Sequence, residues 1–199
     1  MKQRLLFFLM LLSSILHCQT KQDKFAVAYF GSGCFWCVEA IFESVKGVKY
    51  AESGYSGGKV KNPSYNQICT GTTGHAETVK VVYDPKLISY DDLLRVFFNS
   101  HDPTTLNQQG PDKGTQYRSV IFYATDEEKE KAKAYIQKLL ANKNFKSITT
   151  ECTFFEKFYK AEDYHQNYYN EHPTQGYCYA VIAPKIEKFM IKFGNKVKP

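Results

Sequence analysis

The stretch FAVAYFGSGCFWCVEAIFESVKGVKYAESGY, residues 25–55, contains the signals that predict the first elements of the fold. Residues 25–30 form a compact apolar run that predicts a buried strand, and GSG at 31–33 predicts a turn. From Cys34 onward the apolar residues recur at helical spacing until Gly47, and residues 48–55 predict a second strand. The first unit of the chain is therefore expected to be a strand, a helix and a strand.

The following segments extend this unit. Two further strands, 75–84 and 117–124, flank a helix whose start is marked by Ser89 and Asp92 at capping-box spacing. The order β-α-β-β-α-β is the split βαβ plan, so we expect an α+β fold. It is a two-layer α/β sandwich with a ferredoxin-like core, helices on one face of the sheet and long functional loops.

The C-terminal half adds peripheral elements to this core. We expect a helix at 126–142 capped by Thr125 and Glu128, an edge strand within 147–155, a short helix around 161–169, a loop at 176–178 and a last helix from about Pro184. No internal repeat or linker is visible in the sequence, so residues 25–199 are expected to form one domain.

Two polar loops interrupt the regular elements, at 56–74 and 101–116. Loops of this length in a compact domain are usually functional or disordered. Hydrophobic residues make up 43% of the chain and the net charge is +6, with lysines scattered rather than gathered in a stripe. A globular protein without a nucleic-acid partner is expected. The 15 Tyr and 15 Phe residues fit either an aromatic core or an aromatic-lined pocket.

The N-terminus has the pattern of an export signal. Lys2 and Arg4 precede an apolar run at 5–16 that is too short to span a bilayer. We interpret residues 1–18 as a signal peptide and residues 19–24 as a tether. Cys18 directly after the apolar run resembles the lipid-modified cysteine of bacterial lipoproteins, although His17 replaces the usual small residue. Export to the periplasm, or anchoring at the cell envelope through Cys18, is the expected localisation.

The pair Cys34 and Cys37 carries the clearest chemical signal, and three interpretations compete for it. A zinc site lacks partners, because there is no second CxxC and the remaining cysteines and histidines are not at ligand spacing. A redox dithiol fits a CxxC at a helix start. A nucleophile beside an apolar wall fits as well, because Phe35 and Trp36 separate the two cysteines. The start of a helix is expected to lower the pKa of the Cys34 thiol.

The sequence as a whole resembles the peptide methionine sulfoxide reductase A family. The resemblance rests on GCFWCVEAIFESVKGV, GYSGGKVKNPSYNQICTGTTGHAETVKVVYDP, ISYDDLL, FFNSHDPTTLNQQGPDKGTQYRS, AEDYHQNY and GYC, in this order between residues 25 and 178. It implies an enzyme that reduces methionine-S-sulfoxide in proteins and peptides, without a cofactor or metal. The alternative from the residues alone is a general thiol–disulfide oxidoreductase that uses Cys34 and Cys37.

The resemblance also implies roles for individual residues. Cys34 corresponds to the cysteine that attacks the sulfoxide sulfur, and Phe35 and Trp36 to the pocket for its methyl group. Glu77 corresponds to the acid that protonates the sulfoxide oxygen; on an alternating strand it shares a face with apolar residues, and partial burial would raise its pKa. Family tyrosines that bind the oxygen match Tyr65 and Tyr117, and an aspartate acting through water matches Asp112.

Attack on the sulfoxide leaves a sulfenic acid that a second thiol must resolve to a disulfide. Cys178 in the GYC motif matches the family's recycling cysteine, while Cys37 stands where glycine is more common, and both remain candidates. The resemblance implies a thioredoxin-like donor and oxidised proteins as partners, and we expect a monomer. Cys69 and Cys152 are interpreted as structural. Three histidines are interpreted as pocket or packing residues rather than ligands: His75, His101 and His165. Glu39 is interpreted as a charge on the helix surface.

Overall fold

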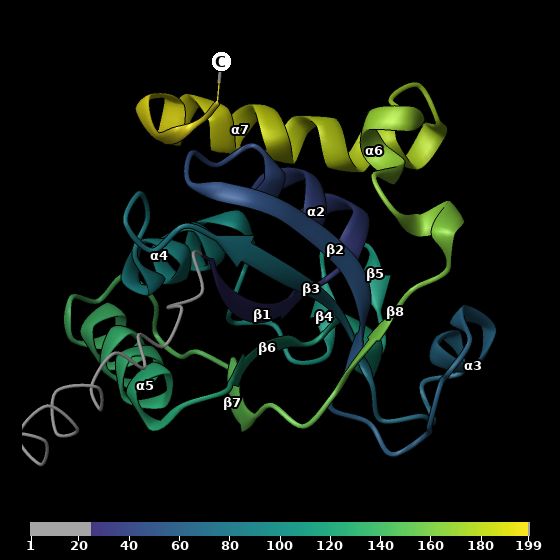
Figure 1. The fold of residues 1–199 in the computed structure, drawn as a ribbon, viewed down its shortest axis with the longest axis horizontal. Helices are drawn as coiled ribbons and strands as arrows, with labels where there is room; N and C mark the ends of the chain where they lie inside the picture. The colour runs from purple at the N-terminus through teal and green to yellow at the C-terminus, as the bar shows by residue number, and fades with distance from the viewer. Residues whose placement is uncertain (1–24, 199) are drawn as a thin grey trace, which may run out of the picture.

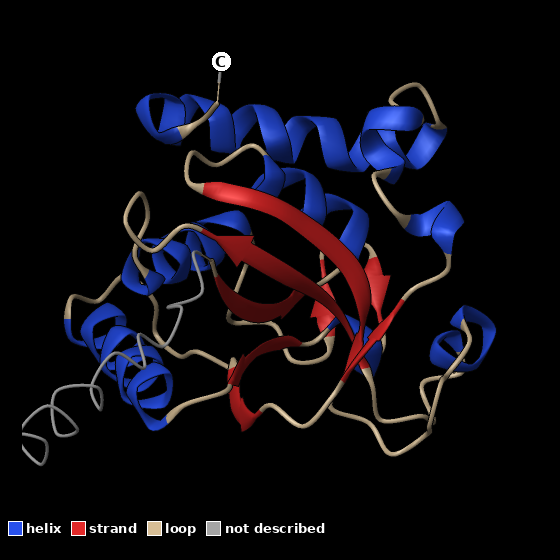
Figure 2. Ribbon diagram, in the orientation of Figure 1, coloured by secondary structure: helices blue, strands red, loops and turns tan. Residues whose placement is uncertain are grey.

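The computed structural model describes residues 25–198, which build a six-stranded main sheet, the helices around it and a two-stranded hairpin of β4 (Gln108–Gln109) and β5 (Asp112–Lys113). The strand order is β7-β6-β1-β3-β2-β8 (Figures 1 and 2). The strands are β1 (Ala26–Ser32), β2 (Val48–Ser56), β3 (Ala76–Tyr83), β6 (Ser119–Tyr123), β7 (Glu151–Phe154) and β8 (Phe158–Lys160). The predicted signal peptide, tether and lipid-modified Cys18 lie outside the described residues.

The inner strands have the predicted split βαβ topology. β3 lies between β1 and β2 and runs antiparallel to both, and β6 pairs antiparallel with the other edge of β1. β7 adds to β6 in parallel as the edge strand expected within 147–155, and β8 covers the free edge of β2. The predicted fold class, an α+β sandwich on a ferredoxin-like core, is confirmed.

The helices begin and end largely where the sequence signals predict. Ser89 caps its helix in a complete capping box with Asp92, and the Thr125 hydroxyl accepts a hydrogen bond from the Glu128 N–H. The longer helices are α2 (Phe35–Glu43), α4 (Tyr90–Ser100), α5 (Asp126–Ala141) and α7 (Ala183–Phe193), and the short ones are α3 (Tyr65–Cys69) and α6 (Tyr168–Glu171). In Figure 1, α7 crosses the outer side of α2.

The main core lies between the sheet and α2, α4 and α7. Large side chains such as Phe30, Phe42 and Phe97 are fully buried there, and the rings of the latter two each stack on the ring of Phe30. Burial of each such side chain contributes about 2 to 3 kcal/mol. On the other face of the sheet a small cluster is closed by Phe155, which stacks on Tyr29. The chain between β7 and β8 therefore covers the second face.

Several local predictions differ from the structure. In place of the helix expected around 161–169 there is a 3₁₀ turn, Asp163–His165, followed by α6. The loop at 56–74 contains α3, because Ser64 and Gln67 form a capping box that starts a helical turn. Tyr117 lies in a 3₁₀ turn, Thr115–Tyr117, ahead of β6 rather than inside the strand. Cys178 is not in a loop but begins a π-helical segment, Cys178–Ile182, that continues into α7. No helix within residues 25–198 is long and apolar enough to cross a membrane.

Candidate active site

Cys34 is held at the junction of β1 and α2, where it is the N-cap residue of the helix. The preceding Gly33 has a φ of +90°, and a Cβ at this position would lie 2.7 Å from the Gln109 side chain. A glycine is required here for both reasons. The Cys34 side chain is partly exposed, and the backbone N–H of Trp36 points to its sulfur.

Glu77 approaches the same helix start from β3. Its side chain lies on the helix-facing side of the strand, as the alternation predicts, and is 1% exposed. The carboxyl oxygen Oε2 accepts a hydrogen bond of 2.9 Å from the Phe35 N–H. Burial raises the pKa of Glu77 to about 8, and the charge of Asp112 adds to the rise, while the Phe35 N–H opposes it. At neutral pH the carboxyl group carries a proton.

A cavity of about 300 Å³ opens between these two groups. It is lined by Cys34, Phe35, Trp36, Tyr65, Glu77, Asp112, Tyr117 and Tyr177. Every residue to which the resemblance assigns nucleophilic, acidic, oxygen-binding or methyl-binding chemistry is in this set. The two long loops and α2 bring these residues together, although they are spread over much of the sequence. Tyr177 is the one lining residue that sequence reasoning missed.

The hydroxyl groups of the cavity come from three separate segments. Tyr65 lies at the first turn of α3, where its N–H donates to Glu162 Oε1 at 2.8 Å. The Tyr177 hydroxyl donates to Asp112 Oδ2 at 2.5 Å. Burial raises the pKa values of Tyr65, Tyr117 and Tyr177 far above the ordinary value, so all three remain hydrogen-bond donors. Tyr177 could have been found from its place directly before Cys178 in the GYC motif.

The expected low pKa of the Cys34 thiol is wrong. Burial raises the pKa of Cys34 well above its ordinary value, the charge of Glu77 raises it further, and only the Trp36 N–H lowers it. The helix start is outweighed because Cys34, although partly exposed to the cavity, is surrounded mainly by protein atoms and lies beside a carboxyl group. When Glu77 is protonated, it no longer raises the pKa of Cys34. Near neutral pH, Cys34 and Glu77 together therefore carry at most one negative charge.

Trp36 forms one wall of the cavity, and its indole ring is held in place by Tyr168 and His165. Its indole ring stacks on Tyr168 with 3.8 Å between the ring centroids and an angle of 11° between the planes. The indole N–H donates to Nδ1 of His165 at 3.0 Å, and His165 is 1% exposed. His165 also packs against Phe35 and Tyr65. The earlier interpretation of His165 as a pocket or packing residue agrees with these contacts.

The two candidate resolving cysteines are both buried. Cys37 is 5% exposed on α2, and Cys178 is fully buried at the start of the helical segment that leads into α7. All five cysteines of the described chain are free thiols. The Cys37 N–H donates a hydrogen bond of 3.1 Å to the Cys34 carbonyl, so the two cysteines lie one helical turn apart. Burial raises the pKa of Cys37 to about 11.

Glu39 is buried, so its interpretation as a surface charge is wrong. It is 3% exposed, because residues 165–168 pack against the face of α2 on which it lies. Its carboxylate accepts hydrogen bonds from the Ser53 hydroxyl at 2.6 Å and from the Asn167 N–H at 3.0 Å. Helical spacing could not reveal this burial, because the covering segment is remote in the sequence.

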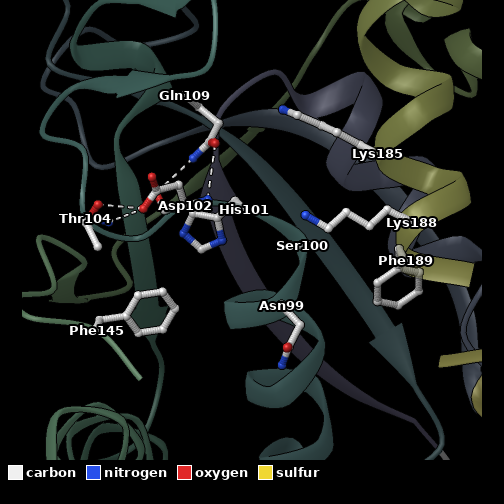
Figure 3. Close-up of a pocket in the computed structure, with 10 residues that line it drawn as sticks. All are labelled: Asn99, Ser100, His101, Asp102, Thr104, Gln109, Phe145, Lys185, Lys188 and Phe189. Carbon is white, nitrogen blue, oxygen red and sulfur yellow. Dashed lines mark hydrogen bonds between the residues drawn. The ribbon is translucent and has the colours of Figure 1, made fainter. Parts of the chain in front are cut away.

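A second cavity, of about 490 Å³, lies between the end of α4 and α7. Figure 3 shows Lys185 and Lys188 extending from α7 on one side of it and His101, Asp102 and Gln109 on the other. Burial lowers the pKa of His101 to about 4, and its ring is held by the Phe97 carbonyl and the Ser119 hydroxyl. His101 therefore packs as a neutral residue, as interpreted. None of the described side chains form a cluster of His, Cys, Asp and Glu that could hold a metal ion.

The fold and the first cavity define a class: a thiol-based oxidoreductase in which a cysteine, a buried carboxyl group and aromatic side chains line one cavity. The chain belongs to the peptide methionine sulfoxide reductase family, whose model matches residues 26–197. The predicted family is confirmed, and with it the predicted class of activity, the reduction of methionine sulfoxide.

Individual relatives agree with this assignment. A peptide methionine sulfoxide reductase MsrA of Nitratiruptor sp. is 57% identical over 83% of this chain and 95% of the relative. That of Rhodopirellula baltica, MsrA 1, is 50% identical over 94% of this chain and 96% of the relative. Among solved structures, reduced Mxr1 from Saccharomyces cerevisiae is 33% identical, with a TM-score of 0.74 over 79% of this chain and 91% of that one. Methionine sulfoxide reductase A of Corynebacterium diphtheriae is 38% identical, with a TM-score of 0.68 over 77% of each chain.

Proposed function

We propose that this chain reduces methionine-S-sulfoxide in oxidised proteins and peptides, with Cys34 as the nucleophile and Glu77 as the general acid. The observation that carries the proposal is the single cavity that contains Cys34, the protonated Glu77 and the aromatic residues Phe35 and Trp36. The S epimer is proposed from the family resemblance alone.

The reacting form of the site has the single negative charge of the pair on the Cys34 sulfur and the proton on Glu77. In the first step this thiolate attacks the sulfoxide sulfur while the proton of Glu77 passes to the sulfoxide oxygen. The S–O bond of the substrate breaks, and its oxygen, which now carries the proton from Glu77, forms a bond to the Cys34 sulfur. The thioether is released, Glu77 is left ionised, and Cys34 has become a sulfenic acid. Tyr65 and Tyr117 donate hydrogen bonds to the oxygen, and Asp112 acts through water with Tyr177 as its hydrogen-bond partner. Such an acid contributes about 100- to 10,000-fold to the rate.

In the second step a resolving thiol attacks the sulfenic sulfur, which releases water and forms a disulfide. Cys178 and Cys37 are the candidates for this thiol. A thioredoxin-like dithiol donor then reduces the disulfide and regenerates both thiols. The alternative of general thiol–disulfide exchange does not use the oxygen-binding set, and the burial of Cys37 limits direct access to it.

The activity is tested with a methionine sulfoxide peptide and dithiothreitol as the reductant. The wild type is expected to release the methionine peptide, and Cys34→Ser is expected to abolish this turnover. A folded, reduced wild-type protein that gives no methionine product would contradict the proposal. Reduction of insulin disulfides by the wild type, lost in Cys37→Ser, would favour the alternative instead.

We also propose that residues 1–18 direct export, that Cys18 carries a lipid, and that residues 25–199 act as a monomeric domain in the periplasm or at the cell envelope. The support is the basic and apolar pattern of the N-terminus. Mass spectrometry of the mature N-terminus tests the proposal. A first residue of Cys18 with added acyl mass is expected, and an unmodified N-terminus would contradict lipidation.

A further inference from the structure

Glu39 is a buried carboxyl group that the proposed reaction does not use. Its partners join two parts of the chain: Ser53 lies on β2, and Asn167 lies just before α6. Gln166 completes the connection from the other side. Its side-chain amide donates to the carbonyl of Ser53 at 3.1 Å and accepts from the Ser53 N–H at 3.0 Å. Residues 166–167 are thus tied to both α2 and β2.

In the sequence, Gln166 and Asn167 lie between the two residues that contact the indole of Trp36. His165, which accepts the indole N–H, precedes Gln166, and Tyr168, which stacks on the indole, follows Asn167. Glu39 itself lies three residues after Trp36 on α2, so both side chains lie on one side of the helix. The described contacts therefore form a closed path from Glu39 through residues 165–168 back to Trp36.

We propose that Glu39 is a positioning residue for the sulfoxide pocket: it anchors residues 165–168 so that His165 and Tyr168 hold Trp36 at the cavity wall. The proposal rests on the function proposed above. Trp36 lines the cavity beside Cys34, so a rotated indole would change how a methyl group fits next to the attacking sulfur.

The two hydrogen bonds of Glu39 do not depend on its charge. An ionised carboxylate accepts both bonds, from the Ser53 hydroxyl and from the Asn167 N–H. A protonated carboxyl, or the amide of Gln, can still accept from the Asn167 N–H and donate to the Ser53 oxygen, because a hydroxyl both donates and accepts. Burial raises the pKa of Glu39 to about 7, with smaller contributions from Glu43 and Glu52. The anchor is therefore expected to persist on both sides of neutral pH.

The test compares Glu39→Ala with Glu39→Gln and uses Glu43→Gln as a control on the same helix. Trp36 is the only tryptophan, so intrinsic fluorescence reports its surroundings directly. Glu39→Ala is expected to shift the emission to the red and to lower kcat/KM for methionine sulfoxide about tenfold, mainly through KM. It should also reduce discrimination against ethionine sulfoxide, which carries one more methylene. Glu39→Gln and Glu43→Gln are expected to stay within about twofold of the wild type, with an unchanged pH profile.

A second pair of variants tests the same anchor without changing Glu39, in case Glu39→Ala does not fold. Asn167 has a φ of +51°, which glycine tolerates and valine does not. Asn167→Val is expected to reproduce the fluorescence shift and the higher KM, and Asn167→Gly to leave both unchanged.

Three results would overturn the proposal. The first is a folded Glu39→Ala variant with wild-type emission and KM. The second is an Asn167→Val variant with wild-type emission. The third is a Glu39→Gln variant that loses one limb of the pH profile, because that would make Glu39 a proton donor. The emission measurements need no turnover, so a failure of the proposed function would be seen separately.

Discussion

Replacing Glu77 by Gln is expected to stabilise the folded protein at alkaline pH while it removes activity. Glu77 is 1% exposed, and its pKa lies at about 8 against an ordinary value of 4.5. An acid with a higher pKa in the folded state binds more protons folded than unfolded, so the free energy of unfolding falls as pH rises. The free energy of unfolding begins to fall near the pKa of Glu77 in the unfolded chain. The fall continues until the pH reaches the pKa of Glu77 in the folded protein, and the contribution is fully lost above it.

The size of this effect follows from the two pKa values. Each pH unit between them corresponds to about 1.4 kcal/mol, so ionisation of Glu77 costs the wild type about 5 kcal/mol across the range. Gln at this position can still accept the hydrogen bond from the Phe35 N–H, and it carries no charge at any pH. Relative to the wild type, Glu77→Gln is therefore expected to gain stability steadily as pH rises through this window.

The assay is urea unfolding of the reduced wild type and Glu77→Gln at several pH values from about 4.5 to about 9, across the two pKa values. The quantity of interest is the difference between their free energies of unfolding, because other titrating groups are common to both proteins. Glu130→Gln on the exposed side of α5 gives the same chemical change at a solvated position. A flat difference between wild type and Glu77→Gln would refute the reasoning, as would activity within about tenfold of the wild type.

Three further predictions concern the thiols, the cavity and the turn. After one equivalent of sulfoxide without reductant, peptide mass mapping is expected to find the nucleophile joined to Cys178, and a bridge to Cys37 would reverse that assignment. Tyr177→Phe removes the hydroxyl that donates to Asp112 and is expected to lower kcat/KM about tenfold, measured with dithiothreitol; an unchanged value would exclude a role for this bond. Gly33→Ala is expected to lower the free energy of unfolding in urea by about 1 to 3 kcal/mol, because φ is +90° and Gln109 occupies the space of the new Cβ. An unchanged free energy of unfolding would show that the turn can relax around the methyl group.

Much of the architecture could be predicted from the sequence because the deciding signals are local. The alternation in β3, the capping box of Ser89 and the helical spacing after Cys34 each involve residues a few positions apart. Such patterns fix where strands and helices begin and end, and their order defines the split βαβ plan. The motifs also indicated which residues gather at the cavity, and the structure places all of them there.

The errors concern properties that depend on remote segments. Glu39 is covered by residues 165–168, and the spacing of residues within α2 cannot reveal this contact. Cys34 lies at a helix start, which favours a thiolate, yet burial and the carboxyl of Glu77 raise the pKa of its thiol. Tyr177 enters the cavity because the chain returns to it ahead of α7, where its hydroxyl meets Asp112.

The sequence by itself determined the order of the elements, the glycine turn before Cys34 and the family to which the chain belongs, because each is written in neighbouring residues or in short motifs. Only the tertiary structure decided which carboxyl groups are buried, where their protons reside and what holds Trp36 in place. The physical reason is that desolvation is a collective effect: the pKa of Glu77 and the burial of Glu39 depend on every segment packed around them.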